Sequence, residues 1–369
     1  MTHINLSRDL LLKLVNRVIG VVEKKHTLAI LSNLLIKQTA HRLSVIATDL
    51  ELQIEASENI QATKTFELTI SAKKLQDVLR VIPENSEIQL EINQNKITIK
   101  QKRSIFNLQT LPSEDFPVIK EEENQEFTLK IEQQKLKSLL HKVAFSMANQ
   151  DIRYYLNGIY IAIEQNKLIL SATDGHRLAL MSEFYAIETD KKQEIILPKK
   201  TVHELLKLLD NNQEMIDITI NNKQIKFEFN HNIMISKVID GKFPDYQRVF
   251  PKNNKYTIGL NKVELTQALQ KTAILSDEKF KSVHFTLKNN KLTINCRNNE
   301  QEQAAEEIDI QYHEDDAINL SFNIHYLMDV LSVLEAETIF LHLNDNHSSV
   351  VITCDEYPEF KYVVMPMRV

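Results

Sequence analysis

The sequence predicts an α+β protein built from three tandem, pseudo-equivalent domains. Its 369 residues exceed the roughly 250–300 residues at which single hydrophobic cores stop growing, so more than one domain is expected. A strand-like segment occurs three times at nearly constant spacing, and helical patterns lie on both sides of each copy. Together these observations favour an internal repeat of mixed helix and sheet.

The repeated strand is the clearest of these signals. The segments LSVIATD (43–49), LILSATD (168–174) and LTINCRN (292–298) follow one another at offsets of 125 and 124 residues. Apolar residues alternate within each segment, which predicts a half-buried β-strand. Each segment ends in Asp or Asn, and these residue types favour a turn directly after the strand.

Two helical segments accompany the strand in each repeat. Apolar residues recur at three- and four-residue spacing, for example at Leu10, Leu14 and Val18 in the first helix. The segments span residues 7–22, 71–82, 132–147, 198–210, 262–275 and 323–334. Alternating runs follow the second helix of a repeat, such as 87–92 with 96–102 and 217–220 with 225–229, and they indicate hairpins.

Two turn-rich segments separate the repeats. They read LPSEDFPVIKEEEN at residues 111–124 and VIDGKFPDYQRVFPKNN at residues 238–254. Clusters of Pro, Gly, Asp and Asn between periodic segments are typical of connections between domains. We therefore expect domains at 1–121, 122–250 and 251–369.

Composition favours a cytoplasmic protein without a membrane span, metal or cofactor. Lys13 and Arg17 interrupt the apolar run at residues 10–22, which predicts an amphipathic helix and not a signal peptide. No apolar stretch approaches the length of a membrane span. Cys296 and Cys354 lack metal-ligand spacing and are too few for a disulfide framework, as expected in a reducing compartment.

Basic residues are concentrated in the predicted helices. The chain carries a formal net charge of −6, yet the six helical segments hold 14 Lys and Arg against 7 Asp and Glu. These cations have two interpretations: good helix formers on solvated faces, or a surface that faces a polyanion. The second is favoured because Glu, an equally good helix former, is scarce there. No sequence-reading motif accompanies them, so we expect weak, sequence-blind contact with phosphates.

The middle repeat departs from the other two after its strand. Asp174 matches Asp49 and Asn298, but Gly175, His176 and Arg177 have no counterparts. One interpretation is a metal-assisted nucleic-acid-processing enzyme that uses Asp174 and His176. The segment lacks an identified nucleophile, a second carboxylate and a phosphate-binding loop, so a protein-binding cleft is favoured.

The end of the chain supports a binding surface. Met365 and Met367 flank Pro366, and flexible thioethers suit surfaces that accept several partners. The alternative for this segment is an ordinary edge strand.

Several longer motifs resemble one known family. They are SMANQDIRYYLNG (146–158), ATDGHRLAL (172–180), DGKFPDYQRV (240–249), ILSDEKF (274–280) and VVMPMR (363–368). With the three repeats, they resemble the bacterial DNA polymerase III beta subunit family, the sliding clamps, over the whole chain. The resemblance implies the DNA clamp fold, in which two protomers close head to tail into a six-domain ring, with helices lining the hole and sheets outside.

The resemblance also implies function and partners. A clamp of this kind is a processivity factor without enzymatic activity that encircles double-stranded DNA and slides along it without sequence specificity. Its partners are the DNA polymerase III alpha subunit, the clamp loader delta subunit and other clamp-binding replication and repair proteins, which share one peptide-binding cleft. No cofactor, metal or membrane is implied.

The resemblance assigns roles to particular residues. The peptide-binding cleft is assigned to Leu156, Thr173, Gly175, His176, Arg177, Leu178, Pro244, Arg248, Val249, Val363, Met365, Pro366, Met367 and Arg368. Contact with DNA is assigned to Lys25, Gln150, Tyr154, Tyr155 and Lys199. The dimer interface is assigned to Lys74, Arg103, Phe106, Leu108, Ile274, Leu275, Glu300, Glu302 and Glu306, with the three glutamates expected on one strand face.

The chain departs from the family pattern in two places. The loop after the first helix reads KKHTLAIL from Lys24, where similar proteins often have Arg-Pro-Thr and Leu-Pro. Ala29 falls in this loop, while Lys25 keeps the positive charge. The last residue is Val369, where Leu or Ile is common.

Overall fold

Each repeat follows one order of strands and helices. The computed structural model describes residues 2–23, 28–93, 95–121, 127–164, 166–185, 192–251, 254–277, 279–314 and 316–367. The first repeat contains β1 (Thr2–Ser7), α1 (Arg8–Val18), β2 (Asn33–Gln38), β3 (Arg42–Thr48), β4 (Leu52–Asn59), β5 (Phe66–Ser71), α2 (Ala72–Val81), β6 (Glu87–Asn93), β7 (Lys96–Gln101) and β8 (Ser104–Gln109).

The second and third repeats have the same order. The second contains β9 (Phe127–Glu132), α3 (Gln133–Ala144), β10 (Gly158–Glu164), β11 (Lys167–Thr173), β12 (Arg177–Phe184), β13 (Gln193–Pro198), α4 (Lys199–Leu208), β14 (Met215–Ile220), β15 (Gln224–Phe229) and β16 (Asn232–Lys237). The third contains β17 (Tyr256–Asn261), α5 (Lys262–Ala273), β18 (Ser282–Lys288), β19 (Lys291–Arg297), β20 (Gln303–Asp309), β21 (Ile318–Asn323), α6 (Ile324–Val333), β22 (Thr338–Leu343), β23 (Val350–Thr353) and β24 (Lys361–Val364). The predicted α+β repeat, its helices and its hairpins are therefore confirmed.

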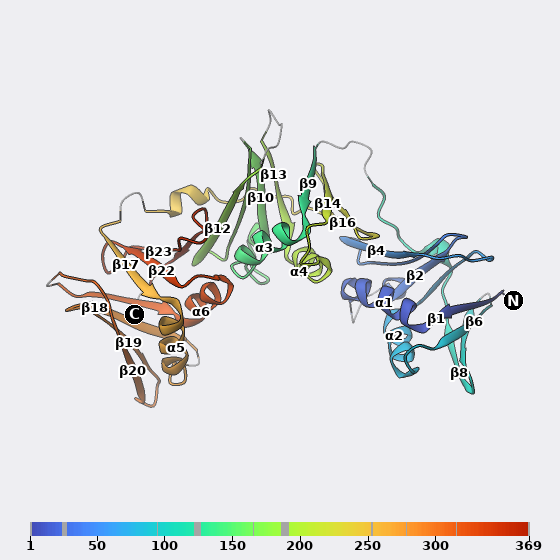
Figure 1. Ribbon diagram of the computed structural model, residues 1–369, viewed down its shortest axis with the longest axis horizontal. Coiled ribbons are helices and arrows are strands. Elements are labelled where there is room, and N and C mark those ends of the chain that lie inside the picture. Colours follow the sequence, from blue (N-terminus) through green and yellow to red (C-terminus); the bar gives the residue numbers. More distant parts are fainter. Residues whose placement is uncertain are drawn as a thin grey trace. The chain divides into compact units, whose positions relative to one another are not determined.

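Capping side chains and apolar faces explain where the helices form. The Ser7 hydroxyl accepts the Leu10 N–H at 3.4 Å at the start of α1, and Asn261 accepts the Glu264 N–H at 3.1 Å at the start of α5. The helices bury one face, which is Leu11, Leu14, Val15 and Val18 in α1 and Leu265, Ala268, Leu269 and Thr272 in α5. Figure 1 shows α1 beside α2 and α5 beside α6 against their sheets.

The strands form two four-stranded and two eight-stranded sheets in the described part of the chain. The orders are β1-β6-β7-β8, β5-β2-β3-β4-β16-β15-β14-β9, β13-β10-β11-β12-β24-β23-β22-β17 and β20-β19-β18-β21. Each eight-stranded sheet joins two repeats through one strand pair, β4 with β16 or β12 with β24. The chain divides accordingly into two compact units, residues 1–135 with 203–238 and residues 136–202 with 239–369.

The predicted alternation of the repeated strand holds only in the third repeat. Strand β19 alternates in burial, but β3 and β11 are buried at every position after the first. The reason is a second apolar layer formed by the connecting segments. Phe116 packs with Leu35 and Ile46, and Phe243 packs with Tyr160 and Ile169. In β19, by contrast, the residues of one face are only partly buried.

The α-helices named above are 10 to 12 residues long. None of those in the described ranges is both long and apolar enough to cross a bilayer.

Candidate partner-binding cleft

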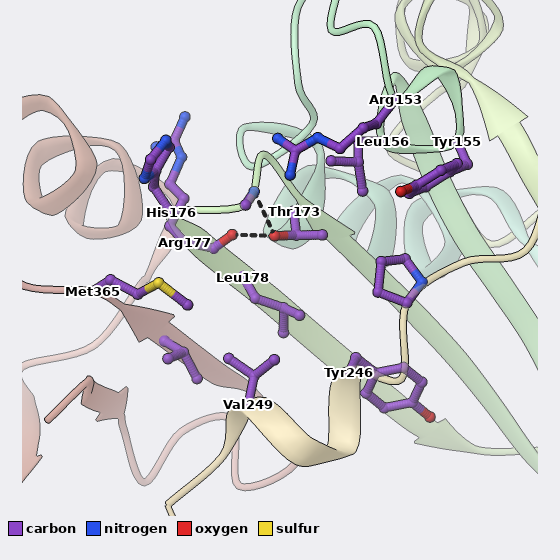
Figure 2. Close-up of a pocket in the computed structure, with 13 residues that line it drawn as sticks. Arg153, Tyr155, Leu156, Thr173, His176, Arg177, Leu178, Tyr246, Val249 and Met365 are labelled. Carbon is purple, nitrogen blue, oxygen red and sulfur yellow. Dashed lines mark hydrogen bonds between the residues drawn. The ribbon is translucent and has the colours of Figure 1, made fainter.

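A cleft of about 190 Å³ lies at the ends of β11, β12 and β24, within the second compact unit. Figure 2 shows Leu178 near its centre, with Val249 and Met365 to one side and Arg153 and Tyr155 to the other. Its lining residues are Arg153, Tyr155, Leu156, Thr173, Gly175, His176, Arg177, Leu178, Pro244, Tyr246, Val249, Val363 and Met365.

The turn between β11 and β12 builds one end of the cleft. The Asp174 carboxylate accepts the N–H groups of His176 at 2.9 Å and Arg177 at 3.1 Å. The Thr173 hydroxyl donates to the Arg177 carbonyl at 2.6 Å and accepts the Gly175 N–H at 3.0 Å, as drawn in Figure 2. Gly175 has φ +92°, a backbone conformation that residues with a Cβ rarely adopt. Glycine therefore favours this turn, although Leu50 adopts a similar φ of 76° at the same position of the first repeat.

Asp174 serves the turn, as its repeat position predicts. Asp49 accepts the N–H groups of Glu51 and Leu52, and Asn298 accepts those of Glu300 and Glu302. The second oxygen of Asp174 accepts from the Arg177 guanidinium at 3.1 Å. Within the described ranges no three His, Cys, Asp or Glu side chains group as metal ligands would. The occupied carboxylate therefore gives no support to the enzyme interpretation.

Arg177 ties the second repeat to the third. Its guanidinium donates to Asp329 at 2.6 Å and to the Phe145 carbonyl at 2.7 Å, and it lies 4.3 Å from the centre of the Tyr326 ring. Burial alone would lower the pKa of Arg177, but Tyr362 and the two carboxylates raise it overall. A cation in the cleft assigned by the resemblance would be expected to hold peptide carbonyls or acids. Its donors are instead engaged by the protein, so Arg177 supports the cleft wall.

A second loop packs beside this turn and completes that end of the cleft. Asp151 accepts two bonds from the Arg153 guanidinium, at 3.0 and 2.9 Å, and Arg153 also donates to the Asp174 carbonyl at 3.2 Å. These bonds and the Arg153 N–H lower the pKa of Asp151 to about 2. Arg153 is thereby fixed beside the Gly175 turn, where its guanidinium lines the cleft.

The floor of the cleft is apolar. Leu178, Val351 and Val363 form a buried cluster, with Tyr246, Val249 and Phe250 packed against it. Leu178 and Val363 face each other across the β12–β24 pair. The Met365 N–H donates to the His176 carbonyl at 2.9 Å, which continues this pairing, while the residue stays 40 % exposed. An apolar side chain from a partner could therefore be desolvated here against pre-formed walls.

Most, but not all, predicted cleft residues line this cavity. Arg248 is ion-paired with Asp245 at 2.7 Å and its side chain is 85 % exposed, so it lies outside the lining. Pro366 and Met367 do not line it either, and the Met367 N–H donates to the Ser321 carbonyl at 2.6 Å. Arg368 and Val369 lie outside the described residues.

Sequence reasoning missed Arg153 and Tyr246 as lining residues and placed Tyr155 elsewhere. Both loops concerned, 146–158 and 240–249, had been singled out as motifs. Tyr154–Leu156 form a 3-10 helical turn, so alternation along the loop gave no signal that separates Tyr155 from Tyr154, which is 58 % exposed.

The first repeat junction has the same backbone arrangement without the same cleft chemistry. The Lys237 N–H donates to the Glu51 carbonyl at 2.8 Å, as Met365 does to His176. Lys237 therefore occupies the position of Met365, and Glu51 that of His176.

The side chains at the first junction pair with one another. The Lys237 ammonium lies 3.1 Å from the Glu51 carboxylate. Gln53 occupies the repeat position of Leu178, and its side-chain oxygen accepts the Ile119 N–H at 2.7 Å. The second junction thus has an apolar cleft where the first has an ion pair and a buried amide.

The residues assigned to DNA contact have mixed surroundings. Gln150 and Tyr154 are exposed on the loop before β10, whereas Tyr155 lines the cleft. The Lys199 ammonium donates to the Ala148 carbonyl at 3.1 Å, and burial lowers its pKa. Lys25 lies outside the described residues.

The residues assigned to a dimer interface lie near two sheet edges. Phe106 and Leu108 are half-buried on β8, while Lys74 and Arg103 are exposed. Ile274 is 80 % exposed after α5, and Leu275 is half-buried.

The predicted shared strand face of the three glutamates is wrong. Glu300 and Glu302 belong to the turn that Asn298 organises before β20, and only Glu306 lies on the strand. The Glu306 carboxylate lies 2.9 Å from the Lys271 ammonium of α5. The turn chemistry of Asn298 therefore overrides the alternation that the sequence suggested.

Three repeats of this topology and a cleft at one repeat junction define a protein of the sliding-clamp class. Models of the N-terminal, central and C-terminal domains of the DNA polymerase III beta subunit match residues 2–120, 130–245 and 247–368. The chain belongs to the DNA polymerase III beta subunit family. Members of this family are DNA sliding clamps and not enzymes, so the predicted function is confirmed.

Full-length relatives support this assignment. The chain is 38 % identical to the beta sliding clamp of Pseudomonas putida over 99 % of its own length and 100 % of the relative's. It is 38 % identical to that of Escherichia coli, with 98 % of each chain covered. A Pseudomonas aeruginosa clamp solved with griselimycin has a TM-score of 0.94 at 36 % identity, covering 100 % of this chain and 99 % of the other. A Caulobacter crescentus beta sliding clamp with bound polyethylene glycol gives 0.94 at 32 %, with the same coverage.

Proposed function

We propose that two copies of this chain associate head to tail around duplex DNA and that the cleft binds short apolar peptide segments. Its partners are the DNA polymerase III alpha subunit, the clamp loader delta subunit and other clamp-binding replication and repair proteins. A bacterial protein that works on chromosomal DNA acts in the cytoplasm. The observation that carries the peptide proposal is the contrast between the two repeat junctions, apolar at Met365 and polar at Lys237.

The size and lining of the cleft suit a pair of apolar side chains. The cavity of about 190 Å³ is lined mostly by apolar side chains and is smaller than the roughly 300–1,000 Å³ of pockets that enclose a drug-sized ligand. The exposed His176 lies on its rim, where it is available to peptide carbonyls or acids, whereas the Arg153 guanidinium is already ion-paired with Asp151. Partners that use the same cleft must compete for it.

Two sheet edges supply the surfaces for association. Among the described strands, β8 pairs only with β7 and β20 only with β19, so each leaves one edge open. The apolar side chains of Ile105 and Ile274, 59 % and 80 % exposed, lie near these edges. Unlike surfaces at the two ends of a chain form a heterologous interface, which closes into a ring when the rotation allows it.

Opposite charges also favour pairing of these two edges. Lys74 and Arg103 lie near β8, while Glu300 and Glu302 lie beside β20. Complementary charges of this kind select the head-to-tail partner over a like-charged edge.

Contact with DNA in this proposal is diffuse. Arg80 of α2 is exposed, but several helical cations are already engaged inside the protein. Arg8 donates to the Leu79 carbonyl, and Lys262 donates to the Leu334 carbonyl. The remaining cations position phosphates without reading bases. Retention on DNA must then come from ring closure and not from affinity.

Release from linear DNA tests this topological retention. The protein is loaded by a bacterial clamp loader onto nicked circular DNA and separated from free protein by gel filtration. The protein should co-elute with the circle and be lost after one restriction cut. Blocking both ends of the linear DNA with bound protein should restore retention. Equal retention on open linear DNA would exclude sliding.

A further inference from the structure

The outer wall of the cleft is part of a connecting segment that makes few backbone hydrogen bonds to the rest of the protein. Residues 240–250 include Pro244, Tyr246 and Val249 of the lining. In the described part of the chain, this stretch holds a short 3-10 helix at Tyr246–Val249 with a local bond from the Arg248 N–H to the Asp245 carbonyl at 3.3 Å, and none of its backbone groups is bonded to a strand. The last tie to a strand is the Ile239 N–H, which donates to the Ile196 carbonyl at 2.9 Å. Side-chain packing must therefore fix the wall.

An aromatic stack supplies that packing. The rings of Phe243 and Tyr160 lie 4.9 Å apart between centroids at 16°, which is a stacked arrangement. Tyr246 lies 5.8 Å from Tyr160 in a tilted arrangement. Phe243 and Tyr160 are 7 % and 6 % exposed, and neither lines the cleft. Phe243 directly precedes Pro244, so the stack holds the first residue of the wall.

Tyr160 is itself held at both ends. Its ring extends from the middle of β10, between paired strands β11 and β13. Its hydroxyl donates to the Glu194 carboxylate at 2.8 Å, and the Lys192 ammonium lies 2.8 Å from the same carboxylate. The ring therefore gives Phe243 a rigid surface that belongs to the sheet and not to the segment.

We propose that Phe243 and Tyr160 are positioning residues of the cleft, acting through Pro244, Tyr246 and Val249 without touching the bound peptide. This inference rests on the proposed peptide-binding function. Loss of the stack lets the wall withdraw from Leu178, because the remaining contact of the segment is the packing of Val249 and its neighbours on the cleft floor. The pocket then loses pre-organisation, and bound peptide dissociates faster.

The first repeat contains a matched control. Phe116 is 5 % exposed, also precedes a proline, and packs on Leu35, the residue in register with Tyr160. Its segment lines no part of the cleft. A Phe116→Ala variant therefore loses a comparable buried ring without touching the proposed mechanism.

Two measurements on the full-length dimer test the inference. The first is the affinity and dissociation rate of a fluorescent peptide ending in Leu-Phe. The second is the methyl NMR spectrum of Val249, Leu178 and Met365 without peptide. Phe243→Ala should weaken binding by about tenfold or more through faster dissociation and should shift or broaden the Val249 methyl signals. Phe116→Ala should lower the melting temperature similarly and leave both readouts unchanged.

Two milder variants guard against misfolding. Phe243→Leu keeps apolar volume but loses the stack, so its affinity should lie between those of wild type and Phe243→Ala. Tyr160→Phe keeps the ring, so its affinity for the peptide should stay within about threefold of the wild-type value. Unchanged Val249 signals and affinity in both Phe243 variants would overturn the inference. If wild type binds no peptide, the proposed function fails, while the methyl spectra still decide whether the stack positions the wall.

Discussion

At the scale of single residues, the middle repeat uses its extra side chains to build a junction. Arg177 lies among two carboxylates, one carbonyl and aromatic rings, and its side chain is only 9 % exposed. Gly175 allows the turn that brings Arg177 there. The segment that the sequence singled out as a protein-binding cleft is therefore structural at Asp174 and Arg177, and the surface it leaves for a partner is mostly apolar.

Replacing Arg177 tests this structural role. Arg177→Met should destabilise the protein by about 3 kcal/mol, because Asp174, Asp329 and the Phe145 carbonyl lose a buried partner. Differential scanning calorimetry should show a lower melting temperature. The control is Arg42→Met, whose ion pair with Glu55 is 43 % exposed on the arginine side and should contribute less than about 1 kcal/mol. Equal shifts in the two variants would contradict the assignment.

At the scale of elements, the two repeat junctions share a backbone and differ in side chains. Strand β4 pairs with β16 as β12 pairs with β24, yet Lys237 stands where Met365 stands in the other junction. Changing one side chain at each junction therefore shows how much of peptide binding depends on side-chain chemistry and how much on the shared backbone.

Each of these two residues can be replaced by the other in a separate variant. Peptide binding should change only in the variant of the second junction. Met365→Lys should weaken binding of a Leu-Phe peptide by about tenfold or more, because a cation replaces an apolar wall. Met365 is 40 % exposed, so the melting temperature should barely change. Lys237→Met should leave the peptide affinity at the wild-type value. Calorimetric titration of both variants provides the comparison, and normal binding by Met365→Lys would remove this residue from the cleft.

The open edges of the two four-stranded sheets lead to a second prediction at the scale of elements. Ile274→Ala combined with Leu275→Ala should convert a dimer into monomers, because exposed apolar side chains beside an open edge strand are expected to be covered in solution. Sedimentation velocity gives the readout. Phe184→Ala removes an apolar side chain that is 67 % exposed in the middle repeat and should leave the dimer intact. A dimeric double variant would exclude this interface.

The repeated elements could be predicted from sequence because each depends on neighbours within a few residues. Periodicity identified the helices and hairpins, and the repeat position of Asp174 identified its turn. The full burial of β3 and β11 could not be predicted, because Phe116 and Phe243 reach those sheets from distant segments. The hydrogen bonding of the Arg177 guanidinium could not be predicted for the same reason, because its partner Asp329 is far from it in the chain.

At the scale of the whole molecule, the chain is acidic overall while its helices are comparatively basic. Protein that has not been loaded should therefore bind DNA weakly, and its affinity should fall by about tenfold or more between 50 and 200 mM salt. Fluorescence anisotropy with two unrelated duplexes should give equal affinities. Tight binding to one of the two sequences at about 150 mM salt would contradict sliding.

The sheets that cross repeat junctions also affect how the protein is made. Strand β4 (Leu52–Asn59) leaves the ribosome long before its partner β16 (Asn232–Lys237), and β12 waits similarly for β24. At about 5–20 residues per second, each edge stays unpaired for on the order of ten seconds or more during synthesis. A nascent chain in that interval presents an open strand to every other nascent chain nearby. Translation speed between the paired strands therefore sets the period in which this protein is most prone to aggregate.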